Sequence, residues 1–124
     1  MRNQGTIAAA TGAVCLLLVV SQIFLKYSLT RVASGEGGIL AFLRPLICSS
    51  TFWLAITCTA LASVLWLLVL RSAPISVAYP LISLSYVLMV PAARIAFREP
   101  VTLPKVVGTA VICLGVFIVS RALR

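Results

Sequence analysis

Residues 46–70 read LICSSTFWLAITCTALASVLWLLVL, an apolar run that contains no charged side chain. An α-helix needs about 20 such residues to cross the ~30 Å hydrocarbon core of a bilayer. Three further stretches meet the same requirement, at residues 6–29, 75–96 and 103–122. The sequence therefore predicts an all-α membrane protein in which a bundle of four transmembrane helices forms a single domain over residues 1–124.

The composition of the whole chain is that of a protein whose main solvent is lipid. Of its 124 residues, 62% are hydrophobic and only 10% are charged, whereas about a quarter are charged in soluble domains. The formal net charge is +8, but the cations stand at the ends of apolar runs and form no basic patch. This placement suits anionic lipid headgroups and argues against binding of nucleic acid.

The connections between the predicted helices are short. The longest spans residues 30–45, and we expect a loop there because it contains residues typical of turns at a membrane surface, namely Ser34, Gly35, Gly37 and Gly38. The second, residues 71–74, is a tight turn that makes helices two and three antiparallel neighbours. In the third, residues 98–105, Thr102 is the expected N-cap of the last helix.

Four spans would place both termini on one side of the membrane. The cations expected on that side are Arg2, Arg71, Arg121 and Arg124, and those expected on the other are Lys26, Arg31, Arg44, Arg94, Arg98 and Lys105. Under the positive-inside rule this small excess favours both termini outside, and it leaves dual insertion open.

Helix three carries a polar stripe. Its hydroxyl-bearing residues recur at spacings of three and four and so share one face, namely Ser76, Tyr79, Ser83 and Tyr86. They either form interhelical hydrogen bonds, each worth about 1 kcal/mol, or line a substrate path. Pro80 lies in the same helix and lacks a backbone donor, which predicts a kink that opens the bundle near its centre.

Helix one carries Gln22 and Lys26, which are four residues apart and share a face. Lys26 either reaches the interface without a binding role or joins Arg94 and Arg98, expected at the same membrane face, in gripping a lipid phosphate. The residues predicted to bind lipid are Gln22, Lys26, Tyr79, Ser83, Tyr86 and Arg94.

Helix four carries Gly108 and Gly115, which are seven residues apart and share one face. Small residues let helices in lipid approach closely, so these glycines predict a packing surface within one chain or between two chains. Four short helices are too few to enclose a substrate pathway that opens alternately to the two sides of the membrane. We therefore expect a dimer with both glycines near its interface.

No acidic residue or histidine falls in the central part of any predicted span, and no nucleophile–base pair or nucleotide-binding motif is present. The sequence thus predicts no enzyme and no cofactor. Glu36 and Glu99 are expected in interfacial loops, where replacement by Gln would leave substrate binding largely intact. The cysteines have no CxxC spacing and no histidine beside them, so we expect packing roles and neither disulfides nor metal for Cys15, Cys48, Cys58 and Cys113.

Three stretches resemble the four-helix branch of the drug/metabolite transporter superfamily. They are SVAYPLISLSYVL at residues 76–88, SQIFLK at residues 21–26 and REPVTLP at residues 98–104. The first is similar to helix three in the small subunits of the aminoarabinose-phosphoundecaprenol flippase, and the pair Gly108 and Gly115 is similar to the glycines used for dimerisation. This branch also includes the small multidrug resistance proteins.

The chain departs from the multidrug exporters at their essential positions. Their helix-one glutamate corresponds to Leu18, and their helix-three tryptophan corresponds to Ile82. The resemblance therefore implies a flippase-like carrier of the bacterial inner membrane that moves a polyprenyl-phosphate-linked sugar or a related anionic lipid, as a homodimer or as a heterodimer with a similar small subunit. The alternatives are a small multidrug or metabolite exporter and a non-transporting accessory subunit.

Overall fold

The computed structural model describes residues 4–32 and 38–121. Its helices are α1 (Gln4–Val32), α2 (Ile39–Ile47), α3 (Ser50–Ser72), α4 (Ile75–Ile82), α5 (Leu84–Phe97) and α6 (Leu103–Ser120). The described residues contain no strand, and four helical segments are long and apolar enough to cross a membrane, which confirms the predicted all-α fold with four spans. Several residues used in the predictions lie outside the described ranges: Arg2, Ser34, Gly35, Glu36, Gly37, Ala122 and Arg124.

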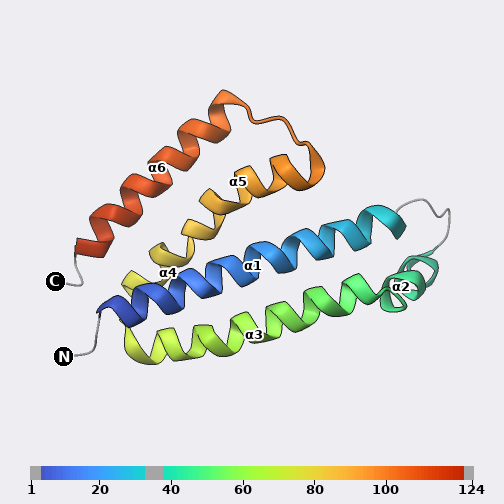
Figure 1. Cartoon of the computed structure of the whole chain (residues 1–124), viewed down its shortest axis with the longest axis horizontal. Coiled ribbons are helices and arrows are strands. Elements are labelled where there is room, and N and C mark those ends of the chain that lie inside the picture. Colours follow the sequence, from blue (N-terminus) through green and yellow to red (C-terminus); the bar gives the residue numbers. More distant parts are fainter. Residues whose placement is uncertain (1–3, 33–37, 122–124) are drawn as a thin grey trace.

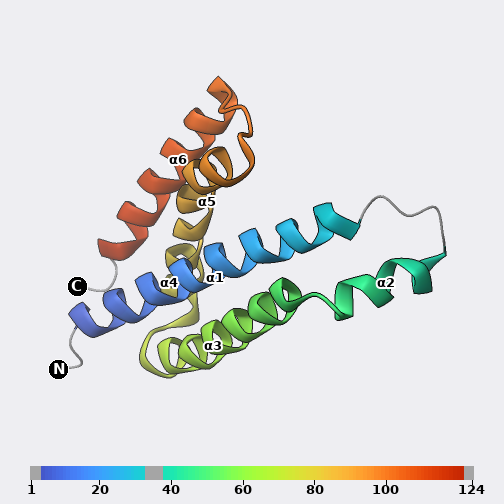
Figure 2. The same cartoon turned by 45° about the vertical axis from the view of Figure 1, so that its right-hand side comes forward.

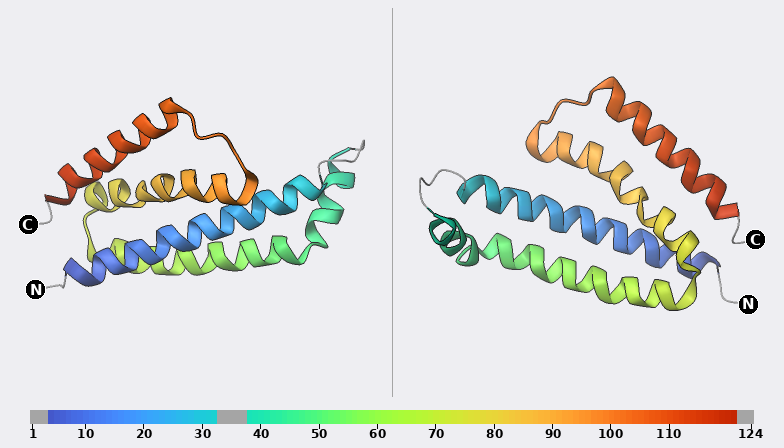
Figure 3. Two further views of the ribbon diagram at one scale, coloured as in Figure 1. Left: turned by 45° about the horizontal axis from the view of Figure 1, so that its top comes forward. Right: turned by 180° about the vertical axis from the view of Figure 1, so that it is seen from behind.

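The four spans form two hairpins. Helices α1 and α3 run antiparallel along most of their length, while α5 packs on α1 and carries α6 on its other side (Figure 1). A second direction of view shows α6 standing away from the pair α1 and α3 (Figure 2). The start of α1 and the end of α6 lie at the same end of the bundle (Figure 3), as an even number of spans requires.

Buried residues, several of them small, repeat along α1 and α3, which pack on each other. Both helices bury side chains at intervals of seven residues, namely Ile7, Val14, Ser21 and Ser28 on α1 and Ala55, Ala62 and Val69 on α3. A repeat of seven keeps one face of each helix against its partner, and small side chains let the backbones approach closely. The hydroxyls of Ser21 and Ser28 donate to carbonyls of α1 itself, at 2.9 and 3.0 Å, so their burial needs no partner on α3.

The prediction of a loop throughout residues 30–45 was wrong, because α2 occupies residues 39–47. Its sequence, ILAFLRPLI, is apolar except for Arg44 and is long enough for more than two helical turns. Leu46 is buried, whereas Ile39 and Leu40 are 75% and 79% exposed. Helix α2 lies at the end of the bundle opposite the termini (Figure 1), where an exposed apolar helix suits the membrane interface.

The third span is broken at Ser83, between α4 and α5. Pro80 has no N–H, so the carbonyl of Ser76 loses its helical donor. The Ser83 hydroxyl donates to the Pro80 carbonyl at 2.5 Å, and the Tyr86 N–H donates to the Ser83 carbonyl at 3.0 Å, three residues back instead of four. The helix is thus interrupted at Ser83, three residues beyond Pro80, and the kink predicted at Pro80 stays a prediction.

The two parts of this broken span differ in how firmly they are held. On α4, Ala78 is completely buried and packs in a cluster with Ile7, Val69 and Ala73. Helices α5 and α6 have no fully buried residue. Apolar burial therefore fixes α4 to the hairpin of α1 and α3, while α5 and α6 add no fully buried side chain to the bundle.

Candidate functional site

A groove follows α5 on the sides that face α1 and α6. It consists of three adjoining cavities of about 350, 450 and 270 Å³. Met89 lines all three, and Gln22, Tyr86 and Glu99 each line two of them. We call these three cavities together the α5 groove.

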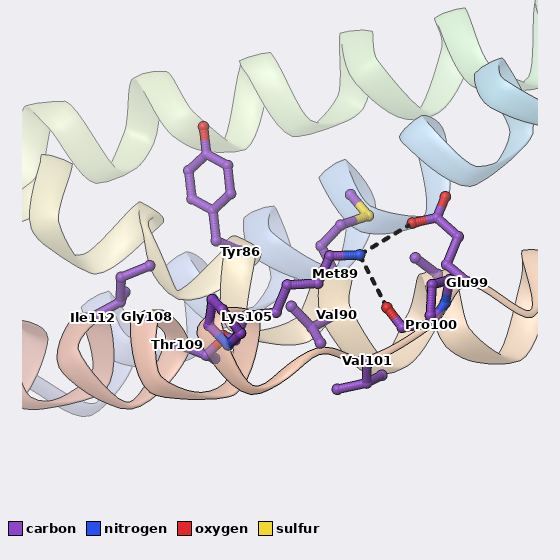
Figure 4. A pocket seen from close by; sticks show the side chains of 12 residues that line it. Tyr86, Met89, Val90, Glu99, Pro100, Val101, Lys105, Gly108, Thr109 and Ile112 are labelled. Atoms are coloured by element: carbon purple, nitrogen blue, oxygen red, sulfur yellow. Dashed lines mark hydrogen bonds and ion pairs between the residues drawn. The ribbon is translucent and has the colours of Figure 1, made fainter.

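One end of the α5 groove holds a cluster of charges. Lys26 forms an ion pair with the carboxylate of Glu99, and the Lys105 Nζ lies 3.9 Å from the second carboxylate oxygen. Lys105 also donates to the Pro100 carbonyl at 3.1 Å (Figure 4). Arg94 donates to the main-chain carbonyl of Glu99 at 3.3 Å. These three cations and one carboxylate form the cation cluster, which carries a net charge of +2.

Helix length and a single turn bring the cluster together. At 1.5 Å per residue, the 29 residues of α1 measure about 43 Å, longer than the ~30 Å hydrocarbon core, so Lys26 in its last part can lie near the interface. Helix α5 ends at Phe97, and the next residue, Arg98, has a left-handed φ of 54°. The chain therefore turns sharply before Glu99 and places its side chain beside α1.

The charges in the cluster act on one another. The hydrogen bond and the charge of Lys26, with a smaller effect of Lys105, hold the pKa of Glu99 below its ordinary value. Lys26 also lies 4.8 Å from the centre of the Phe97 ring. Because the Lys26 and Glu99 side chains are 49% and 33% exposed, solvent screens the pair, and its main effect is to orient both groups at the mouth of the groove.

The structure separates the residues predicted to bind lipid into two groups. Gln22, Lys26 and Tyr86 line the α5 groove. Arg94 lines none of its three cavities, but it holds the main chain of Glu99.

The polar stripe of the third span is divided by the break at Ser83. Tyr79 lies before the break and packs edge-on against Trp66 of α3, with ring centres 5.7 Å apart. Ser83 uses its hydroxyl on the Pro80 carbonyl. Only Tyr86, beyond the break, lines the α5 groove. Tyr79 is nevertheless 58% exposed, and a binding role stays a prediction for Tyr79, Ser83 and Tyr86.

Sequence reasoning missed Glu99 and Lys105 as members of the site. Glu99 does lie in the predicted connection, but it is not isolated there, since it contacts Lys26 and lines two cavities. The sequence did contain an indication of this role, because Glu99 is one of only two acidic residues in the chain and stands between Arg98 and Lys105.

The two glycines of α6 differ in their surroundings. Gly108 lines the cavity between α5 and α6, whereas Gly115 lines none of the cavities of the groove. A Cβ added at either position would meet nothing within 4 Å in the described part of the chain. Neither glycine therefore serves close packing within one chain, and their role in a dimer remains a prediction.

The cysteines lie apart from the cation cluster. Cys15 is buried, and its Sγ lies 3.8 Å from the Ile82 carbonyl beside the break in the third span. Within residues 4–32 and 38–121, no three potential metal-ligating side chains gather at one place.

Comparison with known proteins gives relatives for nearly the whole chain. Residues 48–121 match the model of the EamA-like transporter family. The chain is 39% identical to the probable 4-amino-4-deoxy-L-arabinose-phosphoundecaprenol flippase subunit ArnE of Pseudomonas savastanoi, covering 86% of this chain and 90% of that protein. It is 36% identical to the subunit of the same name in Pseudomonas syringae, covering 86% and 94%, and 46% identical to that of Escherichia coli over 54% and 60%. No solved structure matches.

Proposed function

Because this chain belongs to the EamA-like transporter family, within the drug/metabolite transporter superfamily, we propose that it moves a sugar linked to polyprenyl phosphate between the leaflets of the bacterial inner membrane. It is a multi-pass protein of that membrane. The observation that carries the proposal is the cation cluster at the mouth of the α5 groove. The relatives named above are flippase subunits for an amino sugar on this carrier, and we extend that substrate class to this chain.

The chemistry of the cluster suits a lipid phosphate. A phosphodiester that leaves water loses hydration, and charge-assisted hydrogen bonds to cations offset much of that cost. Lys26 and Lys105 line cavities on the two sides of Glu99 and supply ammonium donors. A phosphate held between them would leave the polyprenyl chain in the surrounding lipid.

Farther along, the α5 groove suits a sugar. Gln22 and Tyr86 supply an amide and a hydroxyl for its polar atoms, and Met89 lines the same cavity as both. These polar groups are few among apolar neighbours, as is typical of sites that fix the orientation of a small ligand. We propose that the headgroup enters at Lys26 and Lys105 and passes Met89 toward Tyr86.

The groove does not favour the alternative of proton-coupled export. Leu18, which corresponds to the glutamate of the multidrug exporters, lines the cavity between α1 and α5. At this position the groove therefore presents methyl groups and no titratable side chain. Transport moves the lipid without changing its covalent bonds, so we assign no enzymatic reaction to the chain.

We propose that the chain works with a partner, either a second copy or a similar small chain. The relatives are named as subunits. Helix α6 has no fully buried residue and contacts α4 and α5, which leaves a long apolar face for a neighbour. Gly115 lies on this helix, and a Cβ added there would meet nothing within 4 Å. A helix of the partner could therefore approach closely at this position.

The proposal is tested by the lipids that copurify with the protein in mild detergent. Mass spectrometry should find polyprenyl phosphate lipids enriched over their share of the membrane. The enrichment should be lost in a Lys26→Gln, Lys105→Gln double variant and kept in Arg121→Gln, which removes a cation at the opposite end of the bundle. Equal lipid profiles for wild type and the double variant would contradict the proposal.

A further inference from the structure

We infer that Glu99 recognises a positively charged amine on the lipid headgroup, so that the cation cluster binds zwitterionic headgroups in which a phosphodiester and a primary ammonium lie close together. This inference rests on the proposed function and assigns a specificity-determining residue to the same site. A phosphate site built only of cations would need no carboxylate at its centre, yet Glu99 stands between Lys26 and Lys105.

The Glu99 carboxylate has room for another donor. An ionised carboxylate can accept about four hydrogen bonds. Lys26 donates to one oxygen, while the Lys105 Nζ lies 3.9 Å from the other, too far for a hydrogen bond. The side chain is 33% exposed and lines two cavities, so an ammonium group in the groove could reach the second oxygen.

The charge balance of the cluster favours a headgroup with both signs. A phosphate held by Lys26 and Lys105 lies beside the Glu99 carboxylate and is repelled by it. An ammonium on the same headgroup would pair with Glu99 and remove this repulsion. Lys26 lowers the pKa of Glu99, so the carboxylate stays ionised at neutral pH and keeps its attraction for the amine.

The position of Glu99 suits a headgroup that bridges the cluster. Lys26 comes from α1 and Lys105 from α6, while Glu99 lies in the connection between α5 and α6. A phosphate near either lysine therefore has the carboxylate as its neighbour. Two lipids offer this chemistry in a bacterial membrane: an amino sugar on a polyprenyl carrier and the ethanolamine headgroup of a phospholipid.

The inference is tested by lipid affinities of wild-type protein and Glu99→Gln, measured by native mass spectrometry on the folded protein in detergent. The probes are polyprenyl-phosphate-linked 4-amino-4-deoxyarabinose and its N-acetylated form, which keeps the sugar and the phosphodiester but loses the positive charge. Phosphatidylethanolamine and its N-acetylated form make a second pair. Preference for the amine in the first pair alone identifies the amino sugar as the ligand, and preference in both pairs identifies the ammonium as the recognised group; either result supports the inference.

Wild-type protein should prefer the amine by about tenfold, the effect of one charged hydrogen bond. Glu99→Gln should lose this preference, and its affinity for the N-acetylated form should rise because the repulsion of the phosphate is gone. A carboxylate that only clamps α1 to the α5–α6 connection would give lower affinity for both forms and an unchanged preference, and this result would overturn the inference. Glu99→Asp, which keeps the charge, should retain the preference.

The same measurement separates failure of this inference from failure of the proposed function. If wild-type protein binds both forms equally but tighter than it binds a diacylglycerol, the phosphate site stands and the role of Glu99 is overturned. If neither form binds tighter than diacylglycerol, the proposed function fails as well.

Discussion

Lys26 and Glu99 are 73 residues apart in the chain, yet their side chains form an ion pair that joins α1 to the connection between α5 and α6. Lys105, from the first turn of α6, approaches the same carboxylate. One acidic residue thus gathers cations from two spans at the mouth of the α5 groove. The same pair links the hairpin of α1 and α3 to helices α5 and α6, which have no fully buried residue.

The stabilising effect of the ion pair between Lys26 and Glu99 should be lost at acidic pH. Because the folded-state pKa of Glu99 is lowered, its contribution is fully present above the ordinary value of 4.5 and is lost as the pH falls through the lower folded value. The difference in melting temperature between wild type and Glu99→Gln should therefore be constant from about pH 5 to 8 and shrink below 4.5. A difference that grows on acidification would contradict this assignment.

The two tyrosines of the third span should differ in function. Tyr86→Phe removes a hydroxyl from the groove and should weaken binding of the lipid-linked sugar about fivefold, the effect of one hydrogen bond. Tyr79→Phe keeps the ring that packs on Trp66 and should leave affinity unchanged. Affinities from native mass spectrometry check both, and an equal loss in the two variants would mean that the whole stripe lines the path.

Charge and shape should matter differently at Lys26 and Arg94. Lys26→Ala should weaken lipid affinity about tenfold, whereas Lys26→Arg, which keeps a donor at the groove, should retain most of it. Arg94→Lys should retain affinity, because Arg94 acts on the Glu99 main chain and lines none of the three cavities. The measurement must use correctly inserted protein. Normal affinity in a Lys26→Ala, Arg94→Ala double variant would exclude the phosphate site.

The glycines of α6 should give separable effects. Gly108→Leu places a side chain in the cavity between α5 and α6 and should reduce lipid binding with little effect on assembly. Gly115→Leu should instead reduce the dimer fraction seen by crosslinking in detergent, because a bulky residue prevents close helix approach. An unchanged dimer fraction in Gly115→Leu would remove this glycine from the interface.

The break at Ser83 should affect movement more than binding. Pro80→Ala restores the N–H that can bond to the Ser76 carbonyl and should straighten the span and raise the melting temperature. Lipid affinity should stay close to wild type, while exchange of a labelled lipid between leaflets of proteoliposomes should slow, because α5 turns less freely on α4. Equal exchange rates in both proteins would show that the break is not used as a hinge.

The four spans could be predicted from the sequence because a single apolar segment in a bilayer must pair its own backbone polar groups as a helix, and that helix has a minimum length. Helix α2 was missed, since the glycines before it indicate a turn and its nine residues are too few to span. The prediction that helices two and three are neighbours was largely wrong, because α3 packs along α1 and meets the third span mainly at α4, although Ala55 and Ala62 stand seven residues apart on α3. Small residues indicate such contacts, but their spacing does not predict which helix packs against them.

The site was predictable only in part, for a reason that lies in its geometry. Gln22 and Lys26 share a face of one helix, and helical spacing alone brings them together. Glu99 reaches Lys26 only through the left-handed turn at Arg98. The sequence does not predict this turn, because a residue other than glycine rarely adopts a left-handed conformation. Contacts between distant segments depend on such turns, and spacing within a helix cannot reveal them.

The most direct test of the account is photocrosslinking with a polyprenyl phosphate lipid that carries its reactive group next to the phosphate. In native membranes, peptide mapping should place the crosslinks on residues that line the α5 groove near the cation cluster, such as Met89, Ala93 and Lys105. Competition with unlabelled lipid should remove them, and Lys26→Gln should reduce them. Crosslinks spread evenly over the lipid-facing surface, or gathered at the opposite end of the bundle around Ile7 and Val69, would contradict a phosphate site at Lys26, Glu99 and Lys105.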